Sequence, residues 1–177
     1  MYKWLTEGGR TPVRRVLWPV TIGDWTPPVS DPRIGGAGWH LMDSSGIAHN
    51  VWDDAPCLWE AVGRGRHAQD LFGDHVYESV SLIRPIGRIT PDMLDALRYD
   101  FVHHARAATP SYVDGESLAD RLWRTAVWSV FQRPTRGERD AERRWQGERI
   151  LELLRRECRI TTRGTWSGWT AGIVWPT

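Results

Sequence analysis

The sequence predicts an α+β protein in which a small N-terminal mixed β-sheet with a short helix precedes three α-helices and a Trp-rich C-terminal tail. Residues 1–89 carry short apolar runs interrupted by Gly and Pro, which is typical of strands joined by turns. From residue 90, apolar positions recur at helical spacing behind capping residues. We therefore expect a β-rich subdomain over 1–89 and a helical subdomain with the tail over 90–177, together forming one compact unit.

The first subdomain has five apolar stretches of strand length. We expect strands at residues 2–6, 15–22, 37–42, 58–62 and 75–86. Pro27 and Pro28 exclude a helix between the second and third of these strands. Asp43 is predicted to cap a short helix that runs to Trp52. The Gly-Arg-Gly-Arg segment at 63–66 predicts a turn.

Three helices are expected in the second subdomain, each with a start signal. Thr90 is the predicted N-cap of the first, with a proline at the first helical position. The second is expected from about Ser117 to Gln132, and the third from Thr135, where Glu138 completes a capping box, to about Cys158. The candidate buried side of the third helix consists of Trp145, Ile150, Leu153, Leu154 and Cys158.

Composition narrows the setting of the protein. Cys57 and Cys158 are far apart and have no partner at metal-site spacing, so we expect reduced, inert thiols and a cytoplasmic location. No stretch has the length and apolar character of a membrane span, and the first residues lack the layout of a secretory signal. We expect a soluble protein with no membrane partner.

The basic residues are almost all arginine, because Lys3 is the one lysine among 23 Lys and Arg residues. This usage is typical of a GC-rich genome. The excess of arginine from Arg121 to Arg163 nevertheless makes nucleic acid an alternative partner. Acids placed four residues before arginines favour a solvated, salt-bridged helix instead. The candidate nucleic-acid contacts are Arg144, Arg149, Arg155 and Arg156.

Two groups of residues could carry chemistry. His40 ends a Gly-x-His segment on a predicted strand, where the imidazole serves either as a structural hydrogen-bonding group or as part of a ligand site. A second group has metal-ligating side chains but poor spacing, so a solvated loop is the favoured interpretation. These weak metal candidates are His67, Asp70, Asp74 and His75.

The tryptophans are the most unusual feature of the composition. There are 12 of them, and none lies between Trp59 and Trp123, so the chain has two Trp-rich ends. Large aromatic side chains either fill cores or anchor interfaces, and composition leaves both roles open. The candidate binding residues are Trp39, His40, Trp52, Trp166, Trp169 and Trp175.

Several N-terminal segments follow a recognisable order: Tyr-Lys-Trp-Leu-Thr at 2–6, Gly-Arg-Thr-Pro at 9–12, Trp-Pro at 18–19, Gly-Trp-His at 38–40, Leu-Trp-Glu at 58–60, and the run 74–86. This order resembles an uncharacterised family of small bacterial and bacteriophage domains over about residues 2–87. Where that family tends to have Ala-Cys after the histidine, this chain has Leu-Met, so the resemblance implies no thiol role there. It implies no activity.

The order of a Gly-x-His strand, a short helix and a strand with acidic residues is also similar to the NAD pocket of ADP-ribosyltransferase-like folds. That resemblance implies His40 at the nicotinamide, with Trp39 or Trp52 stacking nearby and Glu60 or Glu78 as the catalytic acid. It is a likeness of fold elements, and such a likeness implies no activity by itself.

These observations favour a non-catalytic interaction protein of phage or prophage type, located in the host cytoplasm, that binds a host or viral macromolecule through a Trp/Arg surface. A protein partner is expected and no cofactor. The sequence contains no complete catalytic constellation. The first alternative is an ADP-ribosyltransferase-like enzyme that binds NAD at His40, with Glu60 and Glu78 as catalytic candidates. The second is a nucleic-acid binder that uses Arg121–Arg163.

Overall fold

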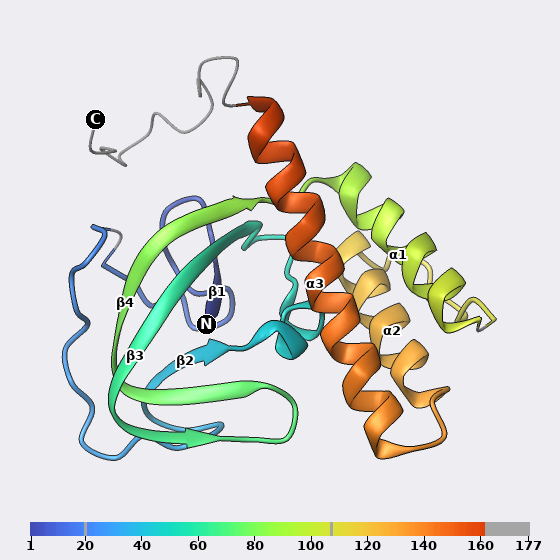
Figure 1. Cartoon of the computed structure of the whole chain (residues 1–177). Helices are drawn as coiled ribbons and strands as arrows, with labels where there is room; N and C mark the ends of the chain where they lie inside the picture. Colours follow the sequence, from blue (N-terminus) through green and yellow to red (C-terminus); the bar gives the residue numbers. More distant parts are fainter. Residues whose placement is uncertain (20, 107, 162–177) are drawn as a thin grey trace.

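The computed structural model describes residues 1–19, 21–106 and 108–161. Strands β1 (Tyr2–Leu5), β2 (Trp39–Met42), β3 (Cys57–Gln69) and β4 (Asp74–Arg88) come first. Helices α1 (Pro91–Ala105), α2 (Leu118–Phe131) and α3 (Arg136–Thr161) follow. The α+β prediction is confirmed. In Figure 1 the strands lie on one side, α1 and α2 on the other, and α3 between them.

Every strand pairing in the described sheet is antiparallel, so the expectation of a mixed sheet was wrong. Two parallel strands need a long crossover connection, which is usually an α-helix. Here all three α-helices come after the last strand, so none of them connects two strands. The order is β1-β2-β4-β3, and it closes because β1 also pairs with β3. Between β1 and β2, however, only Tyr2 and Met42 are paired. The two strands therefore separate on one side of this pair.

Three local expectations need correction. The described part of the segment 15–22, which excludes residue 20, forms no strand, because Arg15 adopts a left-handed conformation (φ 52°) and these residues pair only through an isolated bridge at Leu17. The short helix consists of two 3-10 turns, Ser44–Gly46 and Ala48–Asn50, although Asp43 caps the first as expected. Residues 63–66 continue β3 instead of turning. They do so past a bulge, with the Tyr77 ring packed over Gly63.

All three helix starts are confirmed. The side chains of Thr90 and Ser117 accept hydrogen bonds from the backbone N–H groups of Met93 and Asp120. At the start of α3, the Thr135 hydroxyl accepts from the Glu138 N–H, and the Glu138 carboxylate accepts from the Thr135 N–H. This is the expected capping box. Among the described residues, no helix is both long and apolar enough to cross a bilayer.

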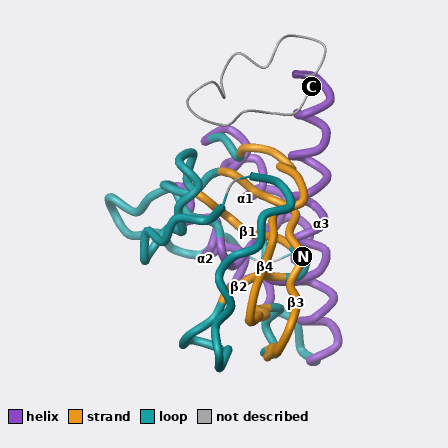
Figure 2. The backbone as a smooth tube through the Cα atoms, turned by 90° about the vertical axis from the view of Figure 1, so that its left-hand side faces the viewer, coloured by secondary structure: helices purple, strands orange, loops and turns teal. Residues whose placement is uncertain are grey.

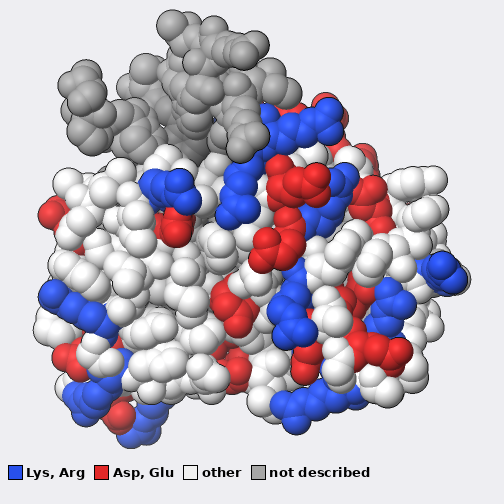
Figure 3. Space-filling model, viewed as in Figure 1, with Lys and Arg blue, Asp and Glu red and all other residues white. Residues whose placement is uncertain are grey.

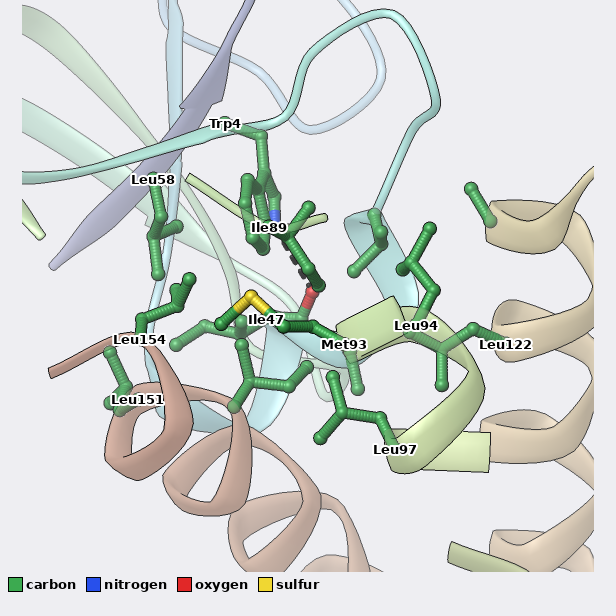
Figure 4. Packing of buried hydrophobic residues seen from close by; sticks show 14 of the residues in the cluster. Trp4, Ile47, Leu58, Ile89, Met93, Leu94, Leu97, Leu122, Leu151 and Leu154 are labelled. Carbon is green, nitrogen blue, oxygen red and sulfur yellow. Dashed lines mark hydrogen bonds between the residues drawn. The ribbon is translucent and has the colours of Figure 1, made fainter. Parts of the chain in front are cut away.

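The main apolar cluster lies between the sheet and the helices. Trp4, which is 1% exposed, donates its indole N–H to the carbonyl of Ile47 over 3.2 Å. Figure 4 shows this bond, with Leu58 beside it and Leu97 and Leu151 reaching in from α1 and α3. Of the α3 residues that we expect to be buried, Ile150 and Leu154 are buried, whereas Trp145 and Leu153 are only partly buried. The Cys158 side chain lies outside the described residues.

A second apolar cluster lies on the other face of β1, where Leu5 packs against Trp18 and Trp59. The segment 23–29 covers β4 next to it: Gly23, Thr26 and Val29 donate backbone hydrogen bonds to carbonyls of β4 at distances of 2.9–3.1 Å. Pro27 and Pro28 have no N–H to donate, so the segment remains a loop. Figure 1 shows it beside β4, and Figure 2 shows it as a loop that crosses in front of the strands.

Candidate functional site

A cavity of about 430 Å³ opens where β1 and β2 separate. Its walls come from β1, β2, the segment 11–18 and the end of the second 3-10 turn. Apolar side chains dominate: Pro12, Val13, Val16, Trp18, Val29, Trp39 and Trp52. The polar lining is Lys3, Thr11, Arg14, His40 and Asn50. None of the described lining residues is acidic.

Two tryptophans form a fixed aromatic wall. Trp18 and Trp39 meet edge to face, with ring centroids 5.4 Å apart and ring planes at 89°. Trp39 also donates its indole N–H to the carbonyl of Pro27 over 2.9 Å, which fixes the ring to the 23–29 loop. Trp18 is 2% exposed, whereas Trp52 is 41% exposed. The wall is therefore held by packing and hydrogen bonding, and Trp52 remains accessible.

A turn closes the cavity from the N-terminal side. Thr11 donates its backbone N–H to the carbonyl of Val16, and Trp18 donates to the carbonyl of Gly9, so the segment folds back on itself. An ion pair of 2.5 Å between Arg15 and Asp54 joins this turn to the segment before β3. Both side chains are largely exposed, so the pair contributes little stability. The turn is thus held mainly by its own backbone hydrogen bonds.

Lys3 is the most informative residue of the cavity. Its ammonium lies 5.3 Å from the centroid of the Trp18 ring. Burial lowers the pKa of Lys3 from 10.5 to about 8, although the nearby Asp74 carboxylate acts in the opposite direction. Lys3 is therefore mostly protonated at pH 7 and half deprotonated near pH 8.

The groups around Lys3 form one electrostatic cluster. Burial lowers the pKa of His40, as do Lys3 and Arg14, while the Gly36 carbonyl and Asp74 oppose this shift. Burial also raises the pKa of Asp74, with Asp70 acting in the same direction. Asp74 is held in place by the Asn50 amide at 3.3 Å. A ligand in the cavity thus meets a cationic amine with an imidazole and a carboxyl group nearby.

The sequence-predicted site residues separate into two sets. Trp39, His40 and Trp52 come together at the cavity. Glu60 and Glu78 do not line it: Glu60 accepts a hydrogen bond of 2.5 Å from Arg84, and Glu78 accepts one of 3.1 Å from the backbone N–H of Arg66. The structure therefore does not bring His40 and a catalytic glutamate together. Trp166, Trp169 and Trp175 lie outside the described residues.

The candidate nucleic-acid arginines lie along α3 among acids. Arg149 contacts Asp100 and Glu152, each at 2.8 Å, and Arg155 lies beside the Tyr2 hydroxyl. Arg144 and Arg156 are exposed. Figure 3 shows basic and acidic side chains interspersed over the part of this face that α3 occupies in Figure 1. This face of α3 therefore carries no continuous basic stripe.

The four weak metal candidates are occupied by contacts to each other, to neighbouring side chains and to the backbone. His67 Nε2 lies 3.0 Å from His75 Nδ1, with the two rings stacked, and His75 also approaches Asp43. Asp70 accepts hydrogen bonds from the N–H groups of residues 72 and 74 in the β3–β4 turn. Among the described residues, no three His, Cys, Asp or Glu side chains are arranged to hold a metal ion.

Lys3, Arg14, Trp18 and Asn50 are cavity residues that the sequence reasoning missed. One signal was present for Lys3, because a chain that uses arginine almost everywhere retains a single lysine. Arginine is too basic to lose its proton in a protein, whereas lysine shifts its pKa readily on burial. For Arg14, Trp18 and Asn50 no local signal exists, since their meeting depends on how the turn at 11–18 folds back.

The chain was compared with models of protein families, with curated proteins and with solved structures. None of the three comparisons gives a match. The resemblances noted for residues 2–87 and for the ADP-ribosyltransferase-like pocket therefore stay predictions.

Proposed function

We propose that the protein binds a small planar aromatic compound with an anionic group, such as a carboxylate or a phosphate, in the cavity lined by Trp18, Trp39 and Lys3. The observation that carries the proposal is the lining: a fixed aromatic wall, three basic side chains and no acidic one among the described residues. Aromatic rings stack on such walls, and a partly buried ammonium binds an anion more strongly than an exposed one does.

The size of the cavity fits this class of ligand. Small-molecule sites have volumes of roughly 300–1,000 Å³, are mostly apolar and carry a few polar groups that orient the ligand. At about 430 Å³, the cavity is at the small end of this range. One or two fused rings with an anionic substituent would fill it, with the anion at Lys3 and the rings against Trp39, which the buried Trp18 supports from behind.

The test is isothermal titration calorimetry at pH 7 with 2-naphthoate, 2-naphthyl phosphate and the neutral 2-naphthylmethanol. We expect at least one anion to bind more tightly than the alcohol. Lys3→Met should weaken the binding of that anion by about 10- to 100-fold, since a hydrogen bond to a charged group contributes about 1.5–3 kcal/mol. Comparing the two anions separates carboxylate from phosphate recognition.

Arg84→Met is the matched control, because Arg84 lies outside the cavity lining and its removal leaves Lys3 in place. Its anion affinity should equal that of the wild type. Equal binding of the alcohol and both anions, or an affinity that Lys3→Met leaves unchanged, would contradict the proposal.

A second candidate function is binding of a protein partner, favoured by the exposed face of α2. Trp123 and Phe131 are 45% and 72% exposed, and with Val127 they follow one another at four-residue spacing. Aromatic side chains of this kind anchor protein interfaces. A photocrosslinker at position 131 should capture one partner in cells that encode the protein, and Trp123→Ala should abolish capture. Placement of the same crosslinker at the exposed Tyr99 of α1 is the control.

The two other candidate functions lack a comparable observation. Transfer from NAD would need a glutamate beside His40, and Glu60 and Glu78 are paired with arginines away from the cavity. Nucleic-acid binding would need unpaired basic side chains, and acids accompany the basic residues along α3. The cavity therefore remains the better-supported site.

A further inference from the structure

We propose that Lys3 is a reactive amine that forms an imine with a planar aromatic aldehyde bearing an anionic group, held in the tryptophan-lined cavity. The inference rests on the proposed binding function and names the reactive class of ligand that the same site would take. Imine formation requires an amine that reaches the ligand, a fraction of that amine without its extra proton, and neighbouring groups that can transfer protons.

The position of the amine meets the first requirement. Lys3 lines the cavity from β1, and its Nζ atom lies over the Trp18 ring. No described carboxylate comes within ion-pair distance of this amine, so no salt bridge holds it away from a ligand. An aldehyde packed against Trp39, which is the partly exposed ring of the aromatic wall, would present its carbonyl carbon to Nζ.

The chemistry of the residue type meets the second requirement. Only an unprotonated amine attacks a carbonyl, and burial in the cavity brings the pKa of Lys3 to about 8. About a tenth of the amine is then free at pH 7, against well under a thousandth for an ordinary lysine. An arginine here could bind the anion but could not form an imine.

The neighbouring groups meet the third requirement. The lone pair of Nζ attacks the carbonyl carbon to give a carbinolamine, and a proton passes from nitrogen to oxygen. The C–O bond then breaks, water leaves, and a C=N bond remains, so one amine and one aldehyde give one imine and one water without oxidation or reduction. His40 from β2 lines the same cavity and is the group that can move these protons. Asp74 from β4 acts electrostatically on both Lys3 and His40, and Arg14 is the additional cation.

The chain offers an unusually clean test, because Lys3 is its one lysine. The probe is 4-formylbenzoate, with 4-(hydroxymethyl)benzoate as the matched compound that cannot form an imine. After borohydride reduction, mass spectrometry should show a stable adduct on Lys3 with the aldehyde and none with the alcohol. Peptide mapping should place the adduct on Lys3 and distinguish it from the terminal α-amine.

The second part of the test measures how fast the adduct on Lys3 forms. The rate should rise as pH increases toward about 8, because the free amine becomes more abundant. At pH 7 the folded protein should react at least about tenfold faster at Lys3 than the urea-unfolded chain, whose lysine has an ordinary pKa. Excess 2-naphthoate should slow the reaction by occupying the cavity. Lys3→Arg and Lys3→Met should lose the adduct at position 3 while circular dichroism shows that they remain folded.

The outcomes separate the inference from the proposed function. If 2-naphthoate and the hydroxymethyl compound bind but no adduct forms on Lys3, the imine proposal is wrong and the binding function stands. Equal trapping in folded and unfolded protein would overturn the imine proposal as well, because the cavity would then add nothing. If no anionic aromatic binds and no adduct forms, both proposals are wrong.

Discussion

At the scale of single residues, Lys3 combines a cost in stability with a gain in binding. Burying a charged amine is unfavourable, and the lowered pKa of Lys3 is a measure of that cost. We therefore expect Lys3→Met, which keeps the length of the side chain, to raise the free energy of unfolding at pH 7. The gain should be on the order of 1–3 kcal/mol, since each pKa unit corresponds to about 1.4 kcal/mol.

The pH dependence gives this prediction a specific sign. The unfolded chain holds the Lys3 proton up to about pH 10.5, whereas the folded protein releases it near pH 8. Between these values the unfolded state binds more protons, so the contribution of Lys3 to stability rises with pH. Urea unfolding from pH 7 to 10 should show this rise in the wild type and a flatter profile in Lys3→Met. A variant that is less stable than the wild type at pH 7 would contradict the prediction.

At the scale of elements, the close contact between α3 and the first 3-10 turn depends on Gly147. A Cβ atom at this position would overlap the backbone carbonyl of Ser44, which cannot move aside as a flexible side chain could. In an exposed helix, Gly→Ala stabilises by up to about 1 kcal/mol. Here we expect Gly147→Ala to lower the free energy of unfolding by about 1–3 kcal/mol, the usual cost of overpacking.

Gly137, in the first turn of the same helix, is the matched control. Apart from the chain neighbours and the backbone of the helix itself, no described atom lies within 4 Å of a Cβ at this position, so Gly137→Ala should leave stability unchanged or raise it. Chemical denaturation of both variants measures the difference. Equal effects of the two substitutions would show that helix propensity, and not the contact with Ser44, decides the outcome.

The elements also show what local sequence signals can and cannot predict. Thr90, Ser117 and Thr135 act within one turn of their own helices, and all three helix starts were predicted correctly. The Gly-Arg-Gly-Arg segment was misread as a turn because Gly63 is required by the Tyr77 ring on the neighbouring strand, a contact that only pairing creates. His40 was a candidate from its local Gly-x-His pattern, whereas Trp18 and Asn50 reach the cavity only through the folding of distant segments and had no local signal.

At the scale of the whole molecule, α3 links the sheet to the other helices. One buried cluster includes Trp4 and Leu58 from the strands, Leu97 and Leu122 from α1 and α2, and Leu151 from α3. In Figure 4 these side chains converge on one region between the elements. The predicted β-rich and helical subdomains therefore share apolar surface that neither could bury alone.

This shared core predicts that the protein unfolds as one cooperative unit. Leu151 is fully buried in α3, and Leu151→Ala should lower the free energy of unfolding by about 2–5 kcal/mol. If the core is shared, hydrogen exchange should show that Leu151→Ala reduces the protection of the slowest amides in β3 and β4 by the same amount as in α1 and α2, relative to the wild type. Val62→Ala, at a 39% exposed position on β3, is the control and should change protection little in either part. Loss confined to the helices would mean that the sheet is stable without them. In that case the cavity, which is built from the strands and their loops, would persist in a chain without α1, α2 and α3.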